Sequence, residues 1–118
     1  MTNEAKLNLV VIYVRDIEES RGFYSELGLF FEREQHGKGP AHYAASVGTN
    51  AVLELYPASD NNISKARLGF TVDSLSETLA CLAKSNARIL SDIRKSAWGT
   101  RAVVEDPNGN RVELLQAK

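Results

Sequence analysis

The chain has 118 residues, of which 43% are hydrophobic and 25% are charged, and its formal net charge is −1 at pH 7. These values are typical of one soluble globular domain, and without a basic run or stripe nucleic-acid binding has no electrostatic support. No apolar stretch approaches the roughly 20 residues of a membrane span, and no signal-peptide pattern opens the sequence. The single cysteine, Cys81, has no intrachain partner for a disulfide. We therefore expect a cytoplasmic protein without membrane contact.

The first half of the chain predicts a strand, a helix and three further strands. Residues 7–14 are β-prone and apolar on both faces, so both sides of this strand should be covered. Asp16 is expected to cap a helix that ends near Leu27, before Gly28. The remaining strands are predicted at 29–34, 42–47 and 51–56, and a polar linker is predicted at 57–65.

The second half repeats this order. A strand is predicted at 66–72, and Asp73 or Ser74 should cap a helix that ends near Ser85, with Cys81 among its core residues. Strands follow at 88–93, 100–105 and 110–116. We expect a turn or loop at 94–97 and a tight hairpin turn at 106–109, where Asn-Gly supplies the positive φ angles.

The repeat defines the fold class. Val14 and Glu54 in the first half correspond to Val72 and Glu113 in the second, with an offset that is constant to within one residue. A repeat on this scale predicts an α+β fold with two tandem βαβββ modules, at about 7–56 and 66–116, in one domain spanning 1–118. Each module would form a sheet with one helix on one face, so its other face needs cover from the other module, a second chain or a ligand.

This duplication, with DIEESRGFYSELG near the start and WGTRAVVEDPNGNRVELLQ at the end, resembles the vicinal oxygen chelate superfamily. That superfamily includes glyoxalase I (lactoylglutathione lyase), the bleomycin and fosfomycin resistance proteins and the extradiol dioxygenases. The resemblance covers nearly the whole chain and implies two curved mixed sheets around a cavity, often at a dimer interface. It does not specify the function, because the fold hosts several unrelated chemistries.

The resemblance also implies positions for a metal. Members similar to glyoxalase I place four ligands on strands that face the cavity, and the matching positions here are Leu9, Glu54, Arg67 and Glu113. Leucine has no lone pair, and arginine stays protonated and cannot ligate a divalent cation. We therefore expect no metal cofactor. If a divalent Zn, Ni, Mn or Fe ion were bound, Glu54 and Glu113 would be its ligands, completed by water or His42.

Strand parity predicts which side chains face the cavity. The valine before each helix should face that helix, so side chains an odd number of positions away face the opposite side. Arginines among carboxylates and aromatic rings could hold a polar or zwitterionic small molecule. The expected ligand-binding residues are Arg67, Glu54, Glu113, Tyr13, Tyr56, Arg101 and Trp98.

Plainer interpretations of these residues remain open. Glu54 and Glu113 could simply be neutralised by Arg67 or Arg101, and Trp98 could pack at a dimer seam. The parity of His42 is not settled by the sequence, and a lone histidine is more often hydrogen-bonded than a ligand. If Arg67 neutralises carboxylates in a partly dry cavity, Arg67→Ala should cost more stability at pH 8 than at pH 5.

Two functions follow from these observations. The first is a metal-free small-molecule-binding protein of the glyoxalase/bleomycin-resistance type, acting as a homodimer with its cavity at the interface. The alternative is an enzyme, a lyase similar to lactoylglutathione lyase, with Glu113 as catalytic base beside a metal-stabilised enediolate. Leu9 and Arg67 favour the first. The sequence does not name the ligand.

Overall fold

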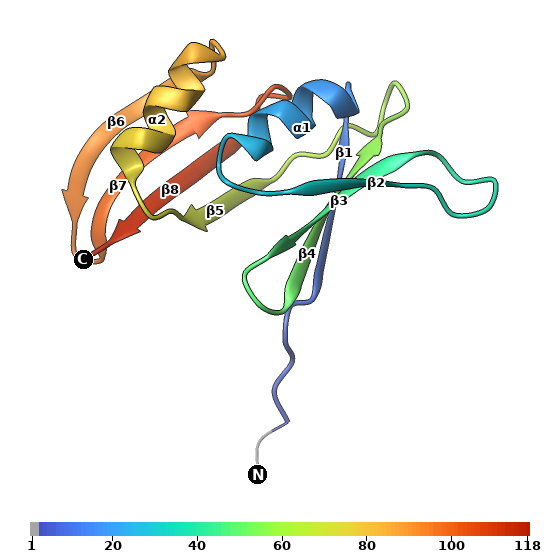
Figure 1. Cartoon of the computed structure of the whole chain (residues 1–118), viewed down its shortest axis with the longest axis horizontal. Coiled ribbons are helices and arrows are strands. Elements are labelled where there is room, and N and C mark those ends of the chain that lie inside the picture. Colours follow the sequence, from blue (N-terminus) through green and yellow to red (C-terminus); the bar gives the residue numbers. More distant parts are fainter. Residues whose placement is uncertain (1–2) are drawn as a thin grey trace.

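The structure is a computed structural model that describes residues 3–118, and it contains two βαβββ modules in tandem (Figure 1). Module 1 comprises β1 (Leu9–Val14), α1 (Ile17–Ser25), β2 (Phe31–Glu34), β3 (His42–Val47) and β4 (Ala51–Pro57). Module 2 comprises β5 (Arg67–Thr71), α2 (Leu75–Lys84), β6 (Arg88–Ser96), β7 (Gly99–Glu105) and β8 (Arg111–Ala117). The predicted α+β fold of two repeated modules is confirmed. Neither helix in the described part is long and apolar enough to cross a membrane.

Each module forms one four-stranded mixed sheet, and the two sheets share one topology. Sheet 1 has the order β1-β4-β3-β2 and sheet 2 the order β5-β8-β7-β6. In each sheet the first strand pairs in parallel with the last, and the other pairs are antiparallel. Glu54 therefore lies opposite Val11, and Glu113 lies opposite Gly69. The repeated topology places these two carboxylates at equivalent positions beside an edge strand.

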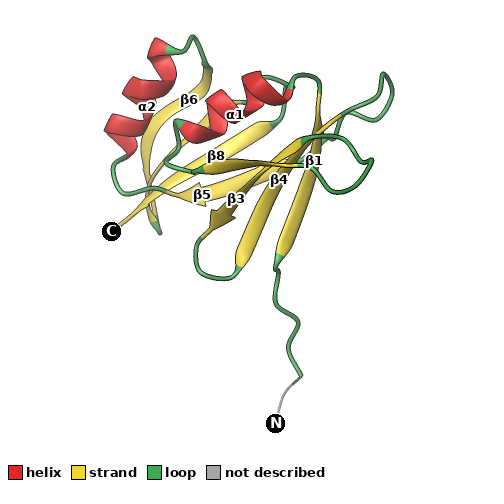
Figure 2. Cartoon of the chain, turned by 45° about the vertical axis from the view of Figure 1, so that its right-hand side comes forward, coloured by secondary structure: helices red, strands yellow, loops and turns green. Residues whose placement is uncertain are grey.

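One face of each sheet packs against the helices and forms the core. Figure 2 shows both helices above the strands. The side chains on this face alternate along the strands with those on the opposite face, as parity predicts. The fully buried members are Val14, Leu55, Val104, Val112 and Leu114, with Ile12, Leu53 and Ala102 nearly as buried. We call the opposite face of each sheet the open face.

The helices begin where the sequence predicts. The Asp16 side chain accepts hydrogen bonds from the first backbone amides of α1, and Ser74, rather than Asp73, caps α2 by accepting from the Glu77 amide. On α2 the buried stripe consists of Leu75, Leu79 and Leu82. Cys81 is exposed, so its prediction as a core residue is wrong. The narrow leucine stripe leaves the position before Leu82 facing water.

The turn predicted at 94–97 is shorter than expected. β6 continues to Ser96, which pairs with Gly99, and its pairing with β7 contains two register shifts, between Ile89 and Ser91 and between Ser91 and Arg94. The chain reverses at Ala97 and Trp98, where the Ser96 hydroxyl donates to the Gly99 carbonyl oxygen at 2.8 Å. Gly99 has φ of +139°, and a Cβ there would lie 2.2 Å from the Gln116 carbonyl oxygen, so only glycine fits.

A buried hydrogen-bond network around Asp106 joins the two modules. The Tyr24 hydroxyl of α1 donates to Asp106 Oδ2 at 2.6 Å, although the two residues are 82 positions apart in the chain. Asp106 Oδ1 accepts from the amides of Asn108 and Asn110, at 2.8 and 2.9 Å, which closes the hairpin turn. Asn110 Oδ1 in turn accepts from the Ala66 amide at the start of module 2. The turn of one module is thus docked onto the helix of the other.

We predict that Tyr24→Phe destabilises the fold by about 1–3 kcal/mol, because Asp106 loses a donor inside the protein while the ring packing is kept. The free energy of unfolding from urea titration measures this loss. Tyr13→Phe is the matched control, since Tyr13 is 39% exposed and its loss should lie within about 0.5 kcal/mol of wild type. Equal unfolding midpoints for Tyr24→Phe and wild type would contradict the assignment.

Candidate functional site

Three predicted residues meet on the open face of sheet 2. Arg67 Nη2 and Arg101 Nη2 both donate to Glu113 Oε1, each at 2.5 Å. The side chains of Arg67, Arg101 and Glu113 are 57%, 35% and 35% exposed, so the cluster is partly hydrated. Two guanidinium groups share one carboxylate oxygen, which leaves the cluster with a net positive charge.

The strand register explains how both arginines reach one carboxylate. Glu113 lies on the central strand β8, opposite Gly69 of β5 and Val103 of β7. Arg67 and Arg101 are each displaced by two residues from these partners, on the same face, which is within the diagonal reach of a long side chain. Gly69 places no side chain between Arg67 and Glu113, and the space above it is open.

The arginines change the acidity of Glu113. The hydrogen bond from Arg67 holds the pKa of the Glu113 carboxyl below its ordinary value of 4.5, and the charges of Arg67 and Arg101 act in the same direction. Partial burial acts in the opposite direction and is a smaller effect than the Arg67 hydrogen bond, though larger than either charge. Glu113 is therefore an ionised hydrogen-bond acceptor at neutral pH, and as a general base it would be weak.

The cluster lies at one wall of a groove of about 500 Å³, which we call the arginine groove. Four arginines line it together with Leu90, Ser91 and Val103; they are Arg67, Arg94, Arg101 and Arg111. Both Arg94 Nη2 and Arg94 Nε donate to the Ser91 hydroxyl, at 2.7 and 3.2 Å, so this side chain is held in place. The groove has volume enough for part of a drug-sized ligand, and its charge favours an anion.

Trp98 lies beside this groove at the tip of the β6–β7 hairpin. Its side chain is 71% exposed, and it shares a smaller hollow of about 210 Å³ with Arg101, Glu113 and Leu115. Both interpretations of Trp98 from the sequence, stacking on a ligand and packing at a dimer seam, remain open to so exposed a ring. A flat apolar ring next to a guanidinium is suited to stacking on an aromatic ligand.

The other predicted residues lie on the open face of sheet 1. The rings of Tyr13 and Tyr56 have centroids 5.8 Å apart, and His42 stacks on Tyr56 at 4.1 Å with an interplanar angle of 11°. Glu54 Oε2 lies 3.8 Å from His42 Nε2. Burial is the main cause that raises the pKa of Tyr56, with the charge of Glu54 next. Of the two carboxylates that Arg67 was predicted to contact, it contacts Glu113, whereas Glu54 lies next to His42.

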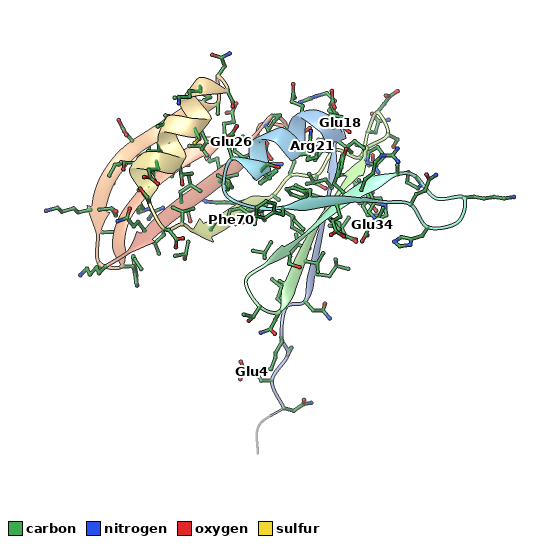
Figure 3. All side chains as sticks on the ribbon, in the orientation of Figure 1. Glu4, Glu18, Arg21, Glu26, Glu34 and Phe70 are labelled. Carbon is green, nitrogen blue, oxygen red and sulfur yellow. The ribbon has the colours of Figure 1, made fainter. Side chains whose placement is uncertain are left out.

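Sequence reasoning missed Arg94, Arg111 and Glu34. The position of Arg94 depends on the irregular register of β6, and this part of the chain was predicted to be a turn. Arg111 was on the correct face by parity but was not assigned a role. Glu34, labelled in Figure 3, ends β2. It lies opposite His42 in the antiparallel pairing of β2 with β3, so the two side chains project from the same face of sheet 1.

A larger hollow, of about 570 Å³, lies on the helix side of the molecule. It is lined by Glu18 and Glu19 of α1, Glu26 at the C-cap of α1 and Glu105 of β7, among others, so its charge is mostly negative. None of the predicted site residues lines it. Several of these carboxylates already have partners within the chain: Glu18 accepts from Tyr43 and Arg21, and Glu26 accepts from Ser85. We therefore assign no ligand to this hollow.

The four positions that the resemblance assigns to metal ligands do not form a donor set for a transition metal. Leu9 has no donor atom, and Arg67 donates a hydrogen bond to Glu113. Glu54 and Glu113 lie in different sheets of the chain and have different partners. Such a set is poor for Zn²⁺ or Ni²⁺, which bind imidazole and thiolate ligands more tightly.

Comparisons with known proteins agree with this architecture. The family model described as Glyoxalase/Bleomycin resistance protein/Dioxygenase superfamily matches residues 6–114. The antibiotic-binding protein TnmS3 from Streptomyces sp. CB03234 has a similar structure, with a TM-score of 0.79 and 22% identity over 100% of both chains. The oxidase ChaP-H2 has a TM-score of 0.78 and 19% identity over 97% of this chain and 94% of its own.

A glyoxalase/bleomycin resistance protein from Streptomyces sp. CB03234 is also similar, with a TM-score of 0.73 and 23% identity over 94% of this chain and 100% of its own. No curated protein matches the sequence significantly. Because all three structures are less than 25% identical to this chain, the likeness establishes the fold alone.

The lowered pKa of Glu113 changes the expected pH dependence of Arg67→Ala. A carboxyl whose pKa is lower in the folded state stabilises the fold fully above its unfolded value, and this stabilisation is lost as the pH falls through the folded value. We predict that Arg67→Ala loses the same stability at pH 8 and pH 5, no more than about 1 kcal/mol for so exposed a pair, and less at pH 3. This replaces the sequence-based expectation of a difference between pH 8 and pH 5, which assumed a dry cavity.

Urea unfolding of wild type and Arg67→Ala at the three pH values measures this dependence. Arg101→Ala is the matched control, because it leaves the Arg67–Glu113 hydrogen bond in place and should show a smaller loss with the same pH profile. A loss that grows as the pH falls would mean that Glu113 is not held ionised by Arg67.

Proposed function

Since the chain belongs to the Glyoxalase/Bleomycin resistance protein/Dioxygenase superfamily, we propose that it binds a small anionic organic molecule in the arginine groove. One observation carries this proposal. Four guanidinium groups line a groove of about 500 Å³, and Glu113, which accepts hydrogen bonds from two of them, lies next to its lining residues. This leaves an excess of positive charge that an anionic ligand would neutralise.

The groups in the groove are also arranged to recognise an anion by hydrogen bonding. Arg67 and Arg101 each donate to Glu113 through one nitrogen, Nη2, while a guanidinium has five N–H donors. The remaining donors can form the paired N–H···O bonds that carboxylates and phosphates accept. Glu113 holds the two side chains in position before a ligand arrives, which lowers the entropic cost of binding.

The position of Trp98 supports the proposal of a ligand with an aromatic part. Its ring is mostly exposed and lies beside Arg101, so an anionic group in the arginine groove would place an attached ring close to the indole. TnmS3, with a similar structure, is described as an antibiotic-binding protein. The proposed role here is binding or sequestration of such a ligand, without a metal in this groove.

The alternative from the sequence, an isomerase similar to lactoylglutathione lyase, has weaker support. That chemistry needs a metal-stabilised enediolate and a carboxylate base. The family positions for the metal include Leu9 and Arg67 here, and Glu113 accepts two charged hydrogen bonds that lower its pKa. A carboxylate stabilised in this way has little tendency to remove a proton from carbon.

We further propose that the protein is a homodimer whose cavity is closed by the open faces. The accessible surface is 7933 Å², whereas a monomeric protein of 13.0 kDa is expected to expose about 6,300 Å². The Cα radius of gyration is 15.1 Å, against about 13.5 Å expected for this length. Exposed apolar side chains on the open face of sheet 1, such as Leu9 and Tyr13, contribute to this accessible surface.

Charge also favours pairing between copies. The open face of sheet 1 carries Glu32, Glu34 and Glu54, whereas the open face of sheet 2 carries the arginines of the groove. In a two-fold dimer, the acidic face of one copy can meet the basic face of the other twice.

The ligand proposal predicts selective binding of aromatic anions. Trp98 is the single tryptophan in the chain, so quenching of its fluorescence reports on the groove directly. We expect 1-naphthyl phosphate and 2-naphthoate to bind at least about tenfold more tightly than the uncharged 2-naphthamide, and their affinity to fall as NaCl is raised.

Two arginine variants test the location of binding. Arg111→Ala should weaken 2-naphthoate binding several-fold, because it removes one guanidinium from the groove while leaving the Glu113 cluster intact. Arg21→Ala is the matched control, since Arg21 lies on α1 and pairs with Glu18 outside the groove. Equal affinity for 2-naphthoate and 2-naphthamide would contradict the proposal that the groove binds an anion.

The dimer proposal predicts a particle of about twice the 13.0 kDa chain mass in light scattering at micromolar concentration. Leu9→Arg should shift this mass toward the monomer, because it places a charge on the open face of β1. Cys81→Ser, on the exposed side of α2, is the control and should leave the mass unchanged. A wild-type particle of 13.0 kDa would contradict the proposal.

A further inference from the structure

We propose that module 1 holds a divalent metal ion, Zn²⁺ by its donor set, between Glu34, His36 and His42. These residues come from the end of β2, the following loop and the start of β3. Their ligand atoms all lie within 4.8 Å of one another. Two imidazoles with a carboxylate form a set that zinc and neighbouring transition metals prefer.

The distances from Glu34 to the two histidine nitrogens are close to the edges of a tetrahedral site. Two ligands that are each about 2.0 Å from a tetrahedral zinc lie about 3.3 Å apart. Glu34 Oε1 is 3.4 Å from His42 Nε2 and 3.6 Å from His36 Nε2. Glu54 Oε2, 3.8 Å from His42 Nε2, is the nearest candidate for the fourth position. Small side-chain rotations would bring the set to ligand distances.

His42 is oriented as metal-binding histidines usually are. Its Nδ1 lies 3.2 Å from the Pro40 carbonyl oxygen, which selects the tautomer with the proton on Nδ1 and leaves the lone pair on Nε2. The ring is stacked on Tyr56 and is only 1% exposed. Nε2 is buried without a hydrogen-bond partner among the described residues, and it faces the carboxylates of Glu34 and Glu54. Leaving such an atom unsatisfied is costly, and a metal ion would satisfy it.

The loop between β2 and β3 brings the second imidazole to the same place. Gly37 adopts φ of +57°, and the Gly39 amide donates to the His36 carbonyl oxygen at 3.0 Å, which closes a tight turn. The side chain of Gln35 donates to the Gly39 carbonyl oxygen and fixes the turn further. The rings of His36 and His42 therefore approach to 5.3 Å between centroids.

This site is separate from the arginine groove and from the family's ligand positions. Of those positions it shares only Glu54, and its other ligands lie on elements that carry none of them. It belongs to sheet 1, whereas the arginine groove belongs to sheet 2. The proposal is therefore independent of anion binding. It departs from the sequence-based expectation that no metal is bound, which was argued from Leu9 and Arg67 and named His42 only as a possible completion of a set with Glu54 and Glu113.

Zinc titration of the full chain without a histidine tag tests the site by isothermal calorimetry. The chain contains only two histidines, and both belong to the proposed set. We expect one Zn²⁺ per chain and at least about tenfold weaker binding for His36→Asn and for Glu34→Gln. His36 is 75% exposed, so His36→Asn should fold normally, which circular dichroism checks.

Glu32→Gln is the matched control. Glu32 lies on the same strand and the same open face as Glu34, two residues away, and contributes no ligand atom to the set. It should bind Zn²⁺ as tightly as wild type. Substitution of Zn²⁺ by Co²⁺ should also give the visible absorption of a tetrahedral site, and His36→Asn should abolish that absorption.

Three results would overturn the proposal. One is the absence of binding heat for wild type at millimolar Zn²⁺. Another is binding that His36→Asn and Glu34→Gln leave unchanged. The third is binding that Glu113→Gln abolishes while His36→Asn does not, which would place the metal at the family's positions instead.

Discussion

The buried carboxylate of Asp106 is the constraint on which the rest of the structure depends. It closes the β7–β8 turn through two backbone amides and accepts a hydrogen bond from Tyr24 in the other module. Burial and the charge of Asp106 raise the pKa of Tyr24 far above its ordinary value, so the hydroxyl remains a neutral donor. The contact fixes α1 against the turn that begins β8, and therefore fixes sheet 1 relative to the strand that carries Glu113.

Because side chains alternate along the strands, the residues that stabilise the core and the residues that can bind a ligand lie on opposite faces of each sheet. Every second side chain on the central strands is apolar and packs on the helices, as Val112 and Leu114 do on β8. The residues between them, such as Glu113, are free to carry charge without a cost to the core. Because the charged residues lie on a face that the helices do not cover, the arginine groove can stay partly hydrated and open to a ligand.

The fold could be predicted from the sequence because its signals are local and occur twice. Each signal is a sequence pattern only a few residues long, as in the Asp16 cap, the turn at Asp106–Asn110 and the alternation of apolar residues. The second half of the chain repeats the same order of elements. The contact of Arg67 with Glu113 followed from parity. The position of Arg94 could not be predicted, because it depends on register shifts in β6 that no local residue pattern specifies. His36 lies near His42 through a glycine-dependent turn, and turn geometry at that precision is not encoded by hydrophobic pattern.

The duplication gives each module the same topology, but the side chains on the open faces have diverged. At the central position of the last strand both modules keep a glutamate, Glu54 and Glu113. In module 1 the neighbouring strands surround it with carboxylate and imidazole groups, which attract a cation. In module 2 they surround it with guanidinium groups, which lower its pKa and leave net positive charge. The surroundings of this glutamate are therefore suited to a cation in module 1 and to an anion in module 2. The difference is set by the residues two positions away on adjacent strands.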